Sequence, residues 1–555
     1  MTRLLIVGGA GVFGRRLAEG LIATTPAHVI IAGRSLSRAE AAAKALAAAG
    51  AAALDRDTSD AAAIAAHAPD IVVDAAGPFQ NGDLRFARAV LEAGAHYLDL
   101  ADARGFAAAF PTLDALAKRC GRVAITGASS TPALTHAVLD HVCAGWRAVD
   151  RVHAGIAPGA RAPRGDSLVR AILSWVGQPL AVWQGGAWRT RRGWSHCRTV
   201  RVAGLGPRRF ALAETPDLDL IPARFAVRDT AWFMAALESA PMHRGLEAVS
   251  ALRAVWAAPE KVAGLMRRAG DVLCVVGSDI GAMFVEASGL DSAGDRVRVR
   301  WRMIAPPGLG PFTPTLPALV LLRRMMQGEQ LALGAKVCVG VVTLAELEPE
   351  LQRLGMTARI ERTRLRSAFQ VALGADYTRL PAAVRAVHDG ASGSRFSGRA
   401  TVQGSRSGAA RLVARVFGLP VPGADAPVTV TMRHEADGME VWERVFNGRH
   451  MRSRLRALGP GRVRESFGPF SFDLAISVRE DALEMAVEAW RLGPFLLPRV
   501  LAPRSDASER QDAAGRFRFD VPIAVPGVGQ ITHYSGFLTP ESVEQSAPAA
   551  LTAAS

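Results

Sequence analysis

Lysine is scarce in this chain, and its scarcity determines the kind of positive charge that the chain carries. Only four of the 555 residues are lysine, so the formal net charge of +15 comes almost entirely from arginine. The arginines are scattered, and many lie beside acidic residues, as in Glu361-Arg362-Thr363-Arg364. The sequence has no block of about five consecutive basic residues, the pattern of arms that bind nucleic acid. We therefore expect no nucleic-acid partner. The alternative for the net positive charge is an attraction to anionic surfaces or substrates.

Cysteines and long apolar runs are also few. The five cysteines are widely separated and form no CxxC pair, which argues against a disulfide framework and against a structural zinc site, so no metal is expected. No apolar run reaches the roughly 18 residues of a transmembrane helix. Glycines interrupt the apolar stretch after Met1, where a secretory signal would lie. The sequence predicts a cytoplasmic protein without a membrane span.

A glycine turn directly follows the first apolar segment, Leu4-Leu5-Ile6-Val7. Within the GxGxxG spacing, Gly9 permits a sharp turn from strand to helix, Gly11 lets a pyrophosphate approach the backbone, and Gly14 lets the helix lie close to the strand. The following stretches read as a helix and a second strand, the context that this motif requires. The alternative is a glycine-rich turn without a ligand. The predicted phosphate-binding residues are Gly8, Gly9, Ala10, Gly11, Val12, Phe13 and Gly14.

The end of the second strand predicts which dinucleotide binds. A carboxylate there would bond the ribose 2′-hydroxyl of NAD, but no Asp or Glu occurs between Glu19 and Glu40. Arg34, Ser35 and Arg38 lie there instead, and a guanidinium forms paired hydrogen bonds with a phosphate. We predict NADP(H) in preference to NAD(H), with Arg34 on the 2′-phosphate and Arg38 as a second candidate. The alternative is that these arginines are solvated charges at a helix start.

Strand and helix patterns alternate as far as about residue 130. This alternation predicts an α/β Rossmann fold, a doubly wound parallel sheet whose ligand lies beyond the carboxyl ends of the strands. A Gly-Pro turn follows the strand that starts at Ile71, so we add Ala76, Gly77, Pro78 and Phe79 to the cofactor groove.

Composition shifts divide the chain further. We predict an NADP-binding domain over 1–130 and an α+β substrate or oligomerisation domain over 131–344, whose end could return to the first domain. A linker over 345–368, a strand-rich α+β domain over 369–540 and a flexible tail over 541–555 follow.

The last domain has alternating strands separated by glycine and proline turns. Asn447-Gly448 between two alternating runs predicts a hairpin with a type I′ turn. Small antiparallel barrels often enclose an apolar ligand. The aromatic side chains of these strands would either line such a cavity or form the ordinary core of the domain; they are Trp442, Phe446, Phe467, Phe470, Phe472 and Trp490.

Four motifs in the first 340 residues or so resemble those of saccharopine-dehydrogenase-like oxidoreductases. They are Gly9-Ala10-Gly11-Val12-Phe13-Gly14, Ala32-Gly33-Arg34-Ser35, Ala76-Gly77-Pro78-Phe79 and Gly94-Ala95-His96-Tyr97-Leu98-Asp99-Leu100. The resemblance implies the fold and a nicotinamide cofactor more than a substrate, because the family also includes reductases of lipid-like molecules. Residues 369–540 resemble a bacterial domain of unknown function, through segments such as Leu373-Gly374-Ala375-Asp376-Tyr377.

A hydride-transfer enzyme needs a group that gives or takes a proton near the reacting atom of the substrate. The Tyr-x-x-x-Lys pair of short-chain dehydrogenases is absent, since none of the three tyrosines has a lysine four residues later. Tyr97 and Asp99, on one short strand, and His136, at the start of a helix, are the candidate catalytic residues. The alternatives are that Tyr97 and His136 are structural and that Asp102, just beyond, is a solvated loop acid.

These observations predict an NADP(H)-dependent oxidoreductase that transfers a hydride to or from a C=N, C=O or activated C=C group of a small molecule. The rival is a non-catalytic protein that senses NADPH or binds a ligand or partner. The lack of an obvious acid–base pair favours the rival, whereas the separate substrate domain favours the enzyme. A homodimer is one assembly that the sequence allows.

Overall fold

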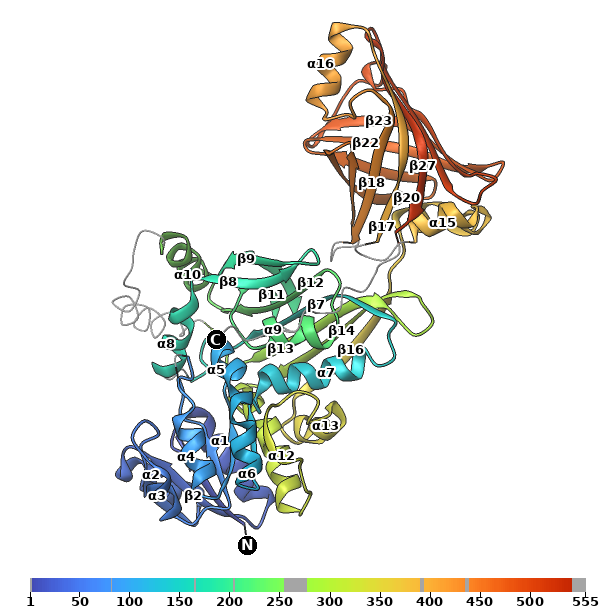
Figure 1. Ribbon diagram of the computed structural model, residues 1–555. Coiled ribbons are helices and arrows are strands. Elements are labelled where there is room, and N and C mark those ends of the chain that lie inside the picture. Colours follow the sequence, from blue (N-terminus) through green and yellow to red (C-terminus); the bar gives the residue numbers. More distant parts are fainter. Residues whose placement is uncertain are drawn as a thin grey trace. The chain divides into compact units, whose positions relative to one another are not determined.

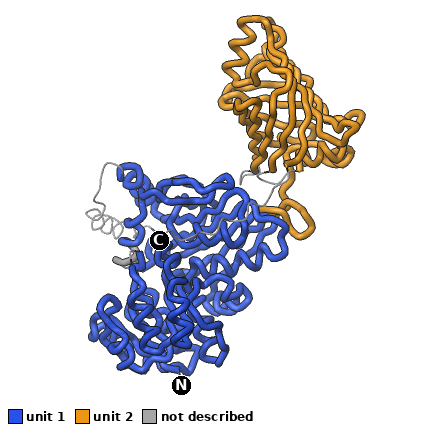
Figure 2. Tube along the Cα trace, viewed as in Figure 1, with its two compact units in different colours: residues 1–288, 298–362 blue, residues 289–297, 363–555 orange. Residues whose placement is uncertain are grey.

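The chain forms two units (Figure 2). The computed structural model describes residues 2–80, 82–163, 166–202, 205–253, 277–389, 394–434 and 439–541. Unit 1 comprises residues 1–288 and 298–362, and unit 2 comprises residues 289–297 and 363–555. Apart from Glu541, the predicted tail lies outside the described residues.

Unit 1 contains a sheet of seven described strands whose pairings are all parallel (Figure 1). The order β15-β6-β5-β4-β1-β2-β3 is the doubly wound order of a Rossmann fold, with β15 added beside β6. The prediction of an α/β Rossmann fold is therefore confirmed. The strands are β1 (Arg3–Val7), β2 (His28–Gly33), β3 (Gly50–Ala53), β4 (Ile71–Asp74), β5 (His96–Asp99), β6 (Val123–Thr126) and β15 (Gly334–Val337).

Helices connect these parallel strands and cover the sheet. The helical stretch after β5 is divided by the 3-10 turn η1 (Phe110–Leu113), because Pro111 has no N–H for an α-helical hydrogen bond. The helices are α1 (Val12–Thr24), α2 (Leu36–Leu46), α3 (Ala61–Ala65), α4 (Arg85–Glu92), α5 (Arg104–Ala109) and α6 (Asp114–Arg119).

The turn between β1 and α1 depends on two glycines. The motif predicts that Gly9 makes the sharp turn. In the structure, the left-handed backbone conformation belongs to Gly8, one residue earlier, which has a φ of 77°. A Cβ atom at Gly14 would lie 2.4 Å from the carbonyl oxygen of Gly8. Only glycine therefore lets α1 begin this close to the end of β1.

A mixed sheet of nine strands in the described part of the chain completes unit 1. Its order is β10-β11-β12-β7-β13-β14-β16, with β8 paired to β12 and to β9. Along β14, half-buried and buried residues alternate, so one face of this strand is dry. The strands are β7 (Ala148–Ala157), β8 (Pro179–Gln184), β9 (Trp188–Arg192), β10 (Arg198–Val202), β11 (Gly206–Leu212), β12 (Thr230–Ala236), β13 (Gly281–Leu290), β14 (Arg296–Ala305) and β16 (Thr357–Arg364).

Further helices lie between these strands. α12 packs on α1 and leads the chain back to β15 of the first sheet. These elements are η2 (Ser130–Leu134), α7 (Thr135–Val142), α8 (Asp166–Trp175), α9 (Asp217–Arg224), α10 (Ala240–Leu252), η4 (Gly310–Thr315) and α12 (Leu316–Met326).

The segment 345–368 holds regular structure where the sequence predicts a linker. Most of it forms α13 (Leu344–Arg353) and β16. The hydroxyl of Thr343 accepts a hydrogen bond from the Glu346 N–H, and the Glu346 carboxylate accepts one from the Thr343 N–H. This capping box starts a helix in a stretch whose Glu and Arg content resembles a linker.

Unit 2 is built around a closed antiparallel barrel. The ring of described strands runs β22-β21-β20-β19-β18-β17-β27-β26-β25-β23, and β23 pairs again with β22. β24 (Phe495–Leu496) pairs with β23 outside the ring. The ring strands are β17 (Arg395–Gly404), β18 (Gly423–His434), β19 (Glu440–Phe446), β20 (Arg449–Gly459), β21 (Arg462–Phe467), β22 (Phe470–Arg479), β23 (Ala482–Leu492), β25 (Asp506–Gln511), β26 (Phe517–Val525) and β27 (Gly529–Pro540).

Short helices lie at the two ends of this barrel. α14 (Ala368–Leu373) packs on β20, β21 and β22, and α15 (Ala382–His388) packs on β25 and β26. α16 (Gly408–Val416) connects β17 to β18 at the other end and packs on β27. Asn447 and Gly448 both have positive φ between β19 and β20, as a type I′ hairpin turn requires.

Separate apolar cores stabilise the two units. In unit 1, cores form on both faces of the first sheet, around Leu4 and Ile6 on one face and Leu5 and Val7 on the other. In unit 2, the core lies inside the barrel. Within the described ranges, no helix combines the length and the apolar character needed to cross a membrane.

We expect Gly14→Ala to destabilise unit 1 by about 2 kcal/mol or more, because its Cβ would overlap the Gly8 carbonyl. Gly105→Ala, in α5, is the matched control: nothing lies within 4 Å of its Cβ, and alanine favours a helix. Urea unfolding of both variants tests this expectation. Equal stabilities would show that α1 shifts without cost.

Candidate functional site

One cleft in unit 1 contains most of the predicted cofactor residues. It has a volume of about 1080 Å³ and lies at the carboxyl ends of the Rossmann strands, the place where ligands of this fold bind. The second sheet supplies the opposite wall through the end of β7, the end of β12 and the start of β13. The cofactor residues that line it are Gly8, Ala10, Gly11, Val12, Phe13, Arg34, Ser35, Arg38, Ala76, Gly77, Pro78 and Phe79.

The first turn leaves backbone amides available at this cleft. The Gly11 N–H donates to the Gly8 carbonyl at 2.8 Å, which closes the turn. Gly11 is also the N-cap of α1, and glycine has no side chain with which to cap the helix. The first amides of α1 therefore remain for an anion, which the positive end of the helix dipole also favours.

Arg34 and Arg38 line the same cleft from the end of β2 and the first turn of α2. Ser35 caps α2 by accepting a hydrogen bond from the Arg38 N–H at 3.4 Å. Both arginines are exposed, and neither forms an ion pair with the described residues. Their charges are thus available to an anionic ligand.

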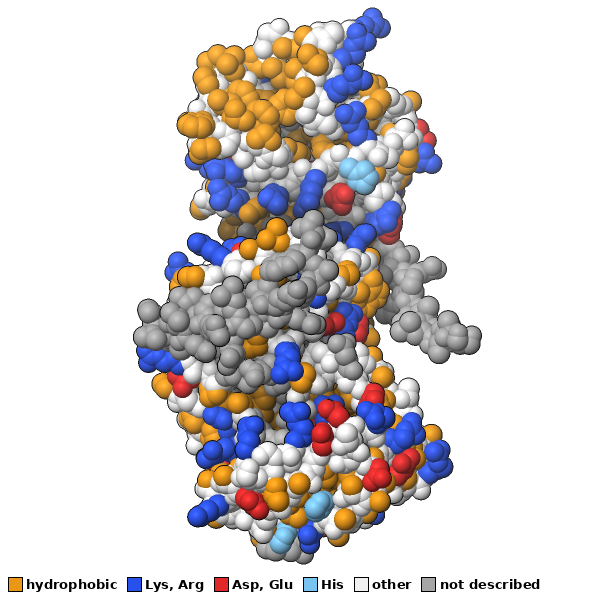
Figure 3. All heavy atoms as spheres, turned by 90° about the vertical axis from the view of Figure 1, so that its left-hand side faces the viewer, with side chains coloured by type: hydrophobic (Ala, Val, Ile, Leu, Met, Phe, Trp, Pro, Cys, Tyr) orange, Lys and Arg blue, Asp and Glu red, His pale blue; other side chains and the backbone are white. Residues whose placement is uncertain are grey.

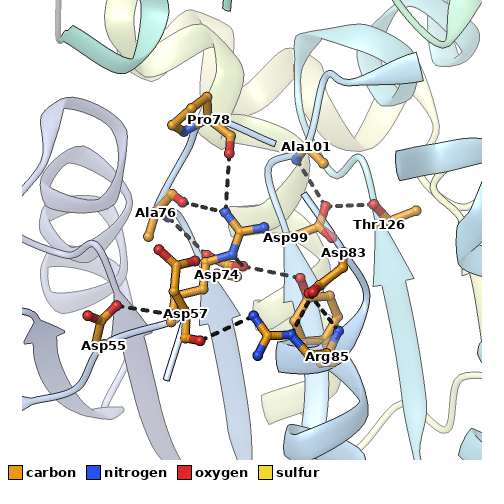
Figure 4. Close-up of polar contacts among 12 residues, drawn as sticks. Asp55, Asp57, Asp74, Ala76, Pro78, Asp83, Arg85, Asp99, Ala101 and Thr126 are labelled. Carbon is orange, nitrogen blue, oxygen red and sulfur yellow. Dashed lines mark hydrogen bonds and ion pairs between the residues drawn. The ribbon is translucent and has the colours of Figure 1, made fainter. Parts of the chain in front are cut away.

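Arg56, which sequence reasoning missed, connects the loop after β3 to the loop after β4. Its Nε lies 2.9 Å from Oδ2 of Asp74, and its Nη1 donates to the carbonyl of Ala76; Figure 4 labels both of these partners. Its guanidinium also lies over the Phe79 ring, 4.4 Å from the centroid. These contacts hold the Gly77-Pro78 turn against the cleft. Arginine is so common in this chain that no sequence signal distinguished Arg56.

Two carboxyl groups are buried beneath the cleft, on neighbouring strands. Asp74 and Asp99 stand opposite each other in the register of β4 and β5, and both are fully buried. Burial raises the pKa of Asp74 to about 6 and that of Asp99 to about 7. Oδ1 of Asp99 accepts hydrogen bonds from the Ala101 N–H and the Thr126 hydroxyl (Figure 4). It also accepts one from the Gly127 N–H.

The three predicted catalytic residues are not among the described residues that line the cleft. Tyr97 shares a strand face with Asp99 and donates to Asp74 at 3.4 Å, deep in the sheet. His136 is fully buried, with Nε2 3.5 Å from Asp217 and Nδ1 3.3 Å from Arg224. The structure therefore brings these residues into internal networks instead of to the cleft surface.

Among the acids that line the cleft, Asp102 and Glu214 come from opposite sheets, and the charge of Asp102 acts on Glu214. Asp102 follows β5 and accepts a hydrogen bond from the Gln80 amide at 3.2 Å. Glu214 follows β11 in the second sheet. Burial raises the pKa of both carboxyls, and the nearby charges of Asp219 and Asp102 raise the pKa of Glu214 further, against the opposing effect of Arg104. Sequence reasoning missed Glu214, because it lies in a distant segment with no motif around it.

The wall formed by the second sheet is mainly apolar. Among its described lining residues, Arg170 is the one basic side chain. Thr131 and Thr215 each have a buried hydroxyl without a hydrogen-bond partner among the described residues, and both line the cleft. The apolar lining residues on this side include Ile156, Trp175, Trp194, Phe233, Met283 and Met303.

A separate polar cluster occurs elsewhere in unit 1. Potential ligand atoms of Cys197, His243 and Glu247 lie within 4.8 Å of one another. The Cys197 thiol donates to Glu247 at 2.7 Å, and Arg209 donates to the same carboxylate at 2.6 Å. Since Arg209 already compensates the charge of Glu247, these contacts account for the cluster as part of the fold.

Comparisons with known families confirm the resemblance that the motifs indicate. Residues 4–139 match the saccharopine dehydrogenase NADP binding domain, and residues 380–538 match a domain of unknown function, DUF4166. The chain therefore carries a saccharopine-dehydrogenase-type NADP-binding domain near its N-terminus and a DUF4166 domain near its C-terminus. No curated protein sequence matches the chain.

Solved structures of low sequence identity are similar to the chain. Apo saccharopine dehydrogenase (L-Glu forming) from Saccharomyces cerevisiae is 12% identical, with a TM-score of 0.50 over 65% of this chain and 100% of that chain. Homospermidine synthase from Legionella pneumophila in complex with NAD is 10% identical, with a TM-score of 0.44 over 65% and 91%. Biliverdin reductase from Synechocystis sp. PCC 6803, in complex with biliverdin and NADP+, is 14% identical, with a TM-score of 0.29 over 63% and 96%.

We expect the stability of unit 1 to fall as the pH rises from about 4 to 7, because native Asp99 keeps its proton longer than the unfolded chain does. Asp99→Asn keeps the Oδ1 acceptor and removes the ionisation. Between pH 5 and pH 8, urea unfolding should show a loss of stability about 2–3 kcal/mol smaller in the variant than in wild type. Equal losses in both proteins would contradict a raised pKa at Asp99.

Proposed function

We propose that the protein is an NADP(H)-dependent oxidoreductase that transfers a hydride to or from a C=N, C=O or activated C=C group. The observation that carries this proposal is the single cleft shared by the dinucleotide-binding turn and the apolar second sheet. Such a cleft can hold a cofactor and a substrate in contact. When bound, the nicotinamide supplies the hydride chemistry, and the protein supplies binding, orientation and electrostatics.

The residues of the first turn fit a dinucleotide phosphate. Gly8, Gly11 and Gly14 leave the approach to the α1 amides open, and a side chain at Gly8 would overlap the backbone of Ala75. Arg34 and Arg38 would hold the 2′-phosphate that distinguishes NADP from NAD, with Ser35 beside them. Val12, Phe13 and the loop from Ala76 to Phe79 would border the rest of the cofactor.

Asp102 and Glu214 are the groups we assign to proton transfer. They line the cleft from opposite sheets, and their raised pKa values keep a larger protonated fraction near neutral pH than ordinary carboxyls have. One can hold a proton for the substrate heteroatom while the other stays charged. Tyr97, Asp99 and His136 then act as positioning residues, since their networks support the loops that carry the cleft residues.

The apolar wall indicates the substrate class. A substrate with several carboxylates needs several cations, and Arg170 is the one described basic residue on the substrate side. Trp175, Phe233 and their apolar neighbours suit a molecule with a substantial apolar part. We therefore propose a small, partly apolar, lipid-like substrate with one reducible double bond.

Replacing Arg34 should separate the two cofactors. We expect Arg34→Ala to weaken NADPH binding by roughly tenfold to a hundredfold and to leave NADH binding nearly unchanged, because only NADPH has the 2′-phosphate. Arg15→Ala, on the exposed side of α1 and outside the cleft, is the matched control. Calorimetry with both nucleotides measures the difference. If Arg34→Ala kept the NADPH preference of the wild-type protein, Arg34 would not be the residue that binds the 2′-phosphate.

Replacing either cleft acid should slow hydride transfer more than it weakens cofactor binding. Asp102→Asn and Glu214→Gln are expected to lower the single-turnover rate by roughly 10²–10⁴ at neutral pH, because each removes a proton carrier. Stopped-flow oxidation of bound NADPH by imines, ketones and enoyl thioesters provides the measurement. Tight NADPH binding without oxidation by any of them would favour a non-catalytic sensor instead.

A further inference from the structure

Exposed large apolar side chains gather at one end of the barrel of unit 2. We define the barrel mouth as residues 405–422, 447–448, 468–469, 492–505 and 526–528, which connect the strands at this end. Of the fifteen exposed large apolar side chains in the described residues, eight lie in the barrel mouth. They therefore form a cluster and are not the singly scattered apolar residues that any protein surface has. They are Leu412, Val416, Val421, Leu492, Phe495, Leu496, Val500 and Leu501.

These side chains belong to one continuous surface. Phe417, at the end of α16, packs on Phe470 of β22 with ring centroids 4.8 Å apart, and Phe470 stacks on Trp490 of β23. The Trp490 indole donates to the Pro498 carbonyl at 3.0 Å. The helix, the strands and the loop over 492–505 are thereby held together. Figure 3 shows apolar side chains gathered at this end of unit 2, with basic side chains beside them.

The polar groups of the barrel mouth carry charge of one sign. Segments 405–422 and 492–505 contain five arginines and no Asp, Glu or Lys. All five arginines are exposed, and none forms an ion pair with the described residues. They are Arg406, Arg411, Arg415, Arg499 and Arg504. Many of the other arginines, by contrast, are paired with acids, such as Arg464 with Asp473 at 2.5 Å.

We propose that the barrel mouth docks on the surface of an anionic lipid bilayer. Val416, Phe495 and Val500 are 70%, 72% and 76% exposed, and they would enter the boundary between headgroups and acyl chains. The arginines would pair with lipid phosphates, and each basic residue near an anionic surface contributes about 1 kcal/mol. The apolar patch therefore matches the acyl chains of such a bilayer, and the unpaired arginines beside it match the anionic headgroups.

The charge also decides between a bilayer and a second copy of the chain. A symmetric dimer places the same patch on both sides of the interface. Two barrel mouths would then bring arginine against arginine without a carboxylate between them, which costs free energy. An anionic bilayer instead supplies the opposite charge and an apolar phase together.

The barrel behind the mouth encloses an apolar cavity of about 190 Å³. Val413, Phe417 and Leu419 line it from the mouth, and four of the predicted aromatic residues line it from the strands: Trp442, Phe446, Phe467 and Phe472. Phe470 and Trp490 are not among its described lining residues, and they support the mouth surface instead. A docked bilayer would therefore meet an opening with an apolar interior.

Vesicle flotation with the full-length protein tests the docking surface. We expect the wild-type protein to float with vesicles of equal parts phosphatidylglycerol and phosphatidylcholine. With pure phosphatidylcholine vesicles it should remain in the bottom fraction, and it should dissociate from the anionic vesicles as the salt concentration rises. Val416→Ser/Phe495→Ser and Arg411→Glu/Arg415→Glu should each weaken binding at least about tenfold. Their side chains are exposed, so thermal unfolding and NADPH binding should stay at wild-type values.

Matched controls carry the same chemical changes away from the mouth. Leu458→Ser lies at the opposite end of the barrel, and Arg452→Glu/Arg456→Glu lies on the outer face of β20; both should float like wild type. Several results would overturn the proposal. They are no flotation of wild type at low salt, equal losses in control and mouth variants, or a dimer in solution that the mouth substitutions dissociate. Binding to duplex DNA as tight as to the vesicles would overturn it as well.

Discussion

The close approach of α1 to the end of β1 is the constraint on which unit 1 depends. A Cβ at Gly14 would lie 2.4 Å from the Gly8 carbonyl oxygen, so the helix can start here only because this position has no side chain. β1 lies between β2 and β4 in the sheet, and the start of α1 therefore sets the floor of the cleft. The loops after the neighbouring strands are arranged around that floor, at the edge where the second sheet meets them.

Buried charge supports those loops. Asp74 and Asp99 would be costly inside the sheet without partners. The Arg56 guanidinium and the Ala76 N–H offset that cost at Asp74, and the Thr126 hydroxyl with two backbone amides offsets it at Asp99. The bonds of Asp99 join the carboxyl ends of β5 and β6, and the Tyr97 hydroxyl of β5 donates to Asp74 of β4, so the network that stabilises the acids also positions the loops that carry Gln80 and Asp102. Burial raises the pKa values of Asp74 and Asp99, and the hydrogen bonds of the same two carboxyl groups support the loops of the cleft.

Unit 2 is stabilised differently, as a closed ring of antiparallel strands. Closing the ring through β22 and β23 leaves no open edge among the ring strands, which protects the barrel from pairing with other chains. Helices α14 and α15 cover one end, while the end near α16 keeps exposed aliphatic and aromatic groups beside arginines. Unit 1 thus has its opening between two sheets, whereas unit 2 has its opening at the end of one.

Local sequence determined the features that a few neighbouring residues can specify: the glycine turn, the alternation of Rossmann strands and helices, Arg34 after β2, and the Asn447-Gly448 hairpin. These depend on backbone sterics and on side-chain periodicity, which act over short stretches. Tertiary structure alone decided that Glu214 joins Asp102, that Arg56 holds the Gly77-Pro78 turn, that Tyr97 and His136 are buried away from the cleft, and that β23 closes on β22. Such pairings join segments far apart in the chain, and the packing that selects them leaves no pattern around either residue.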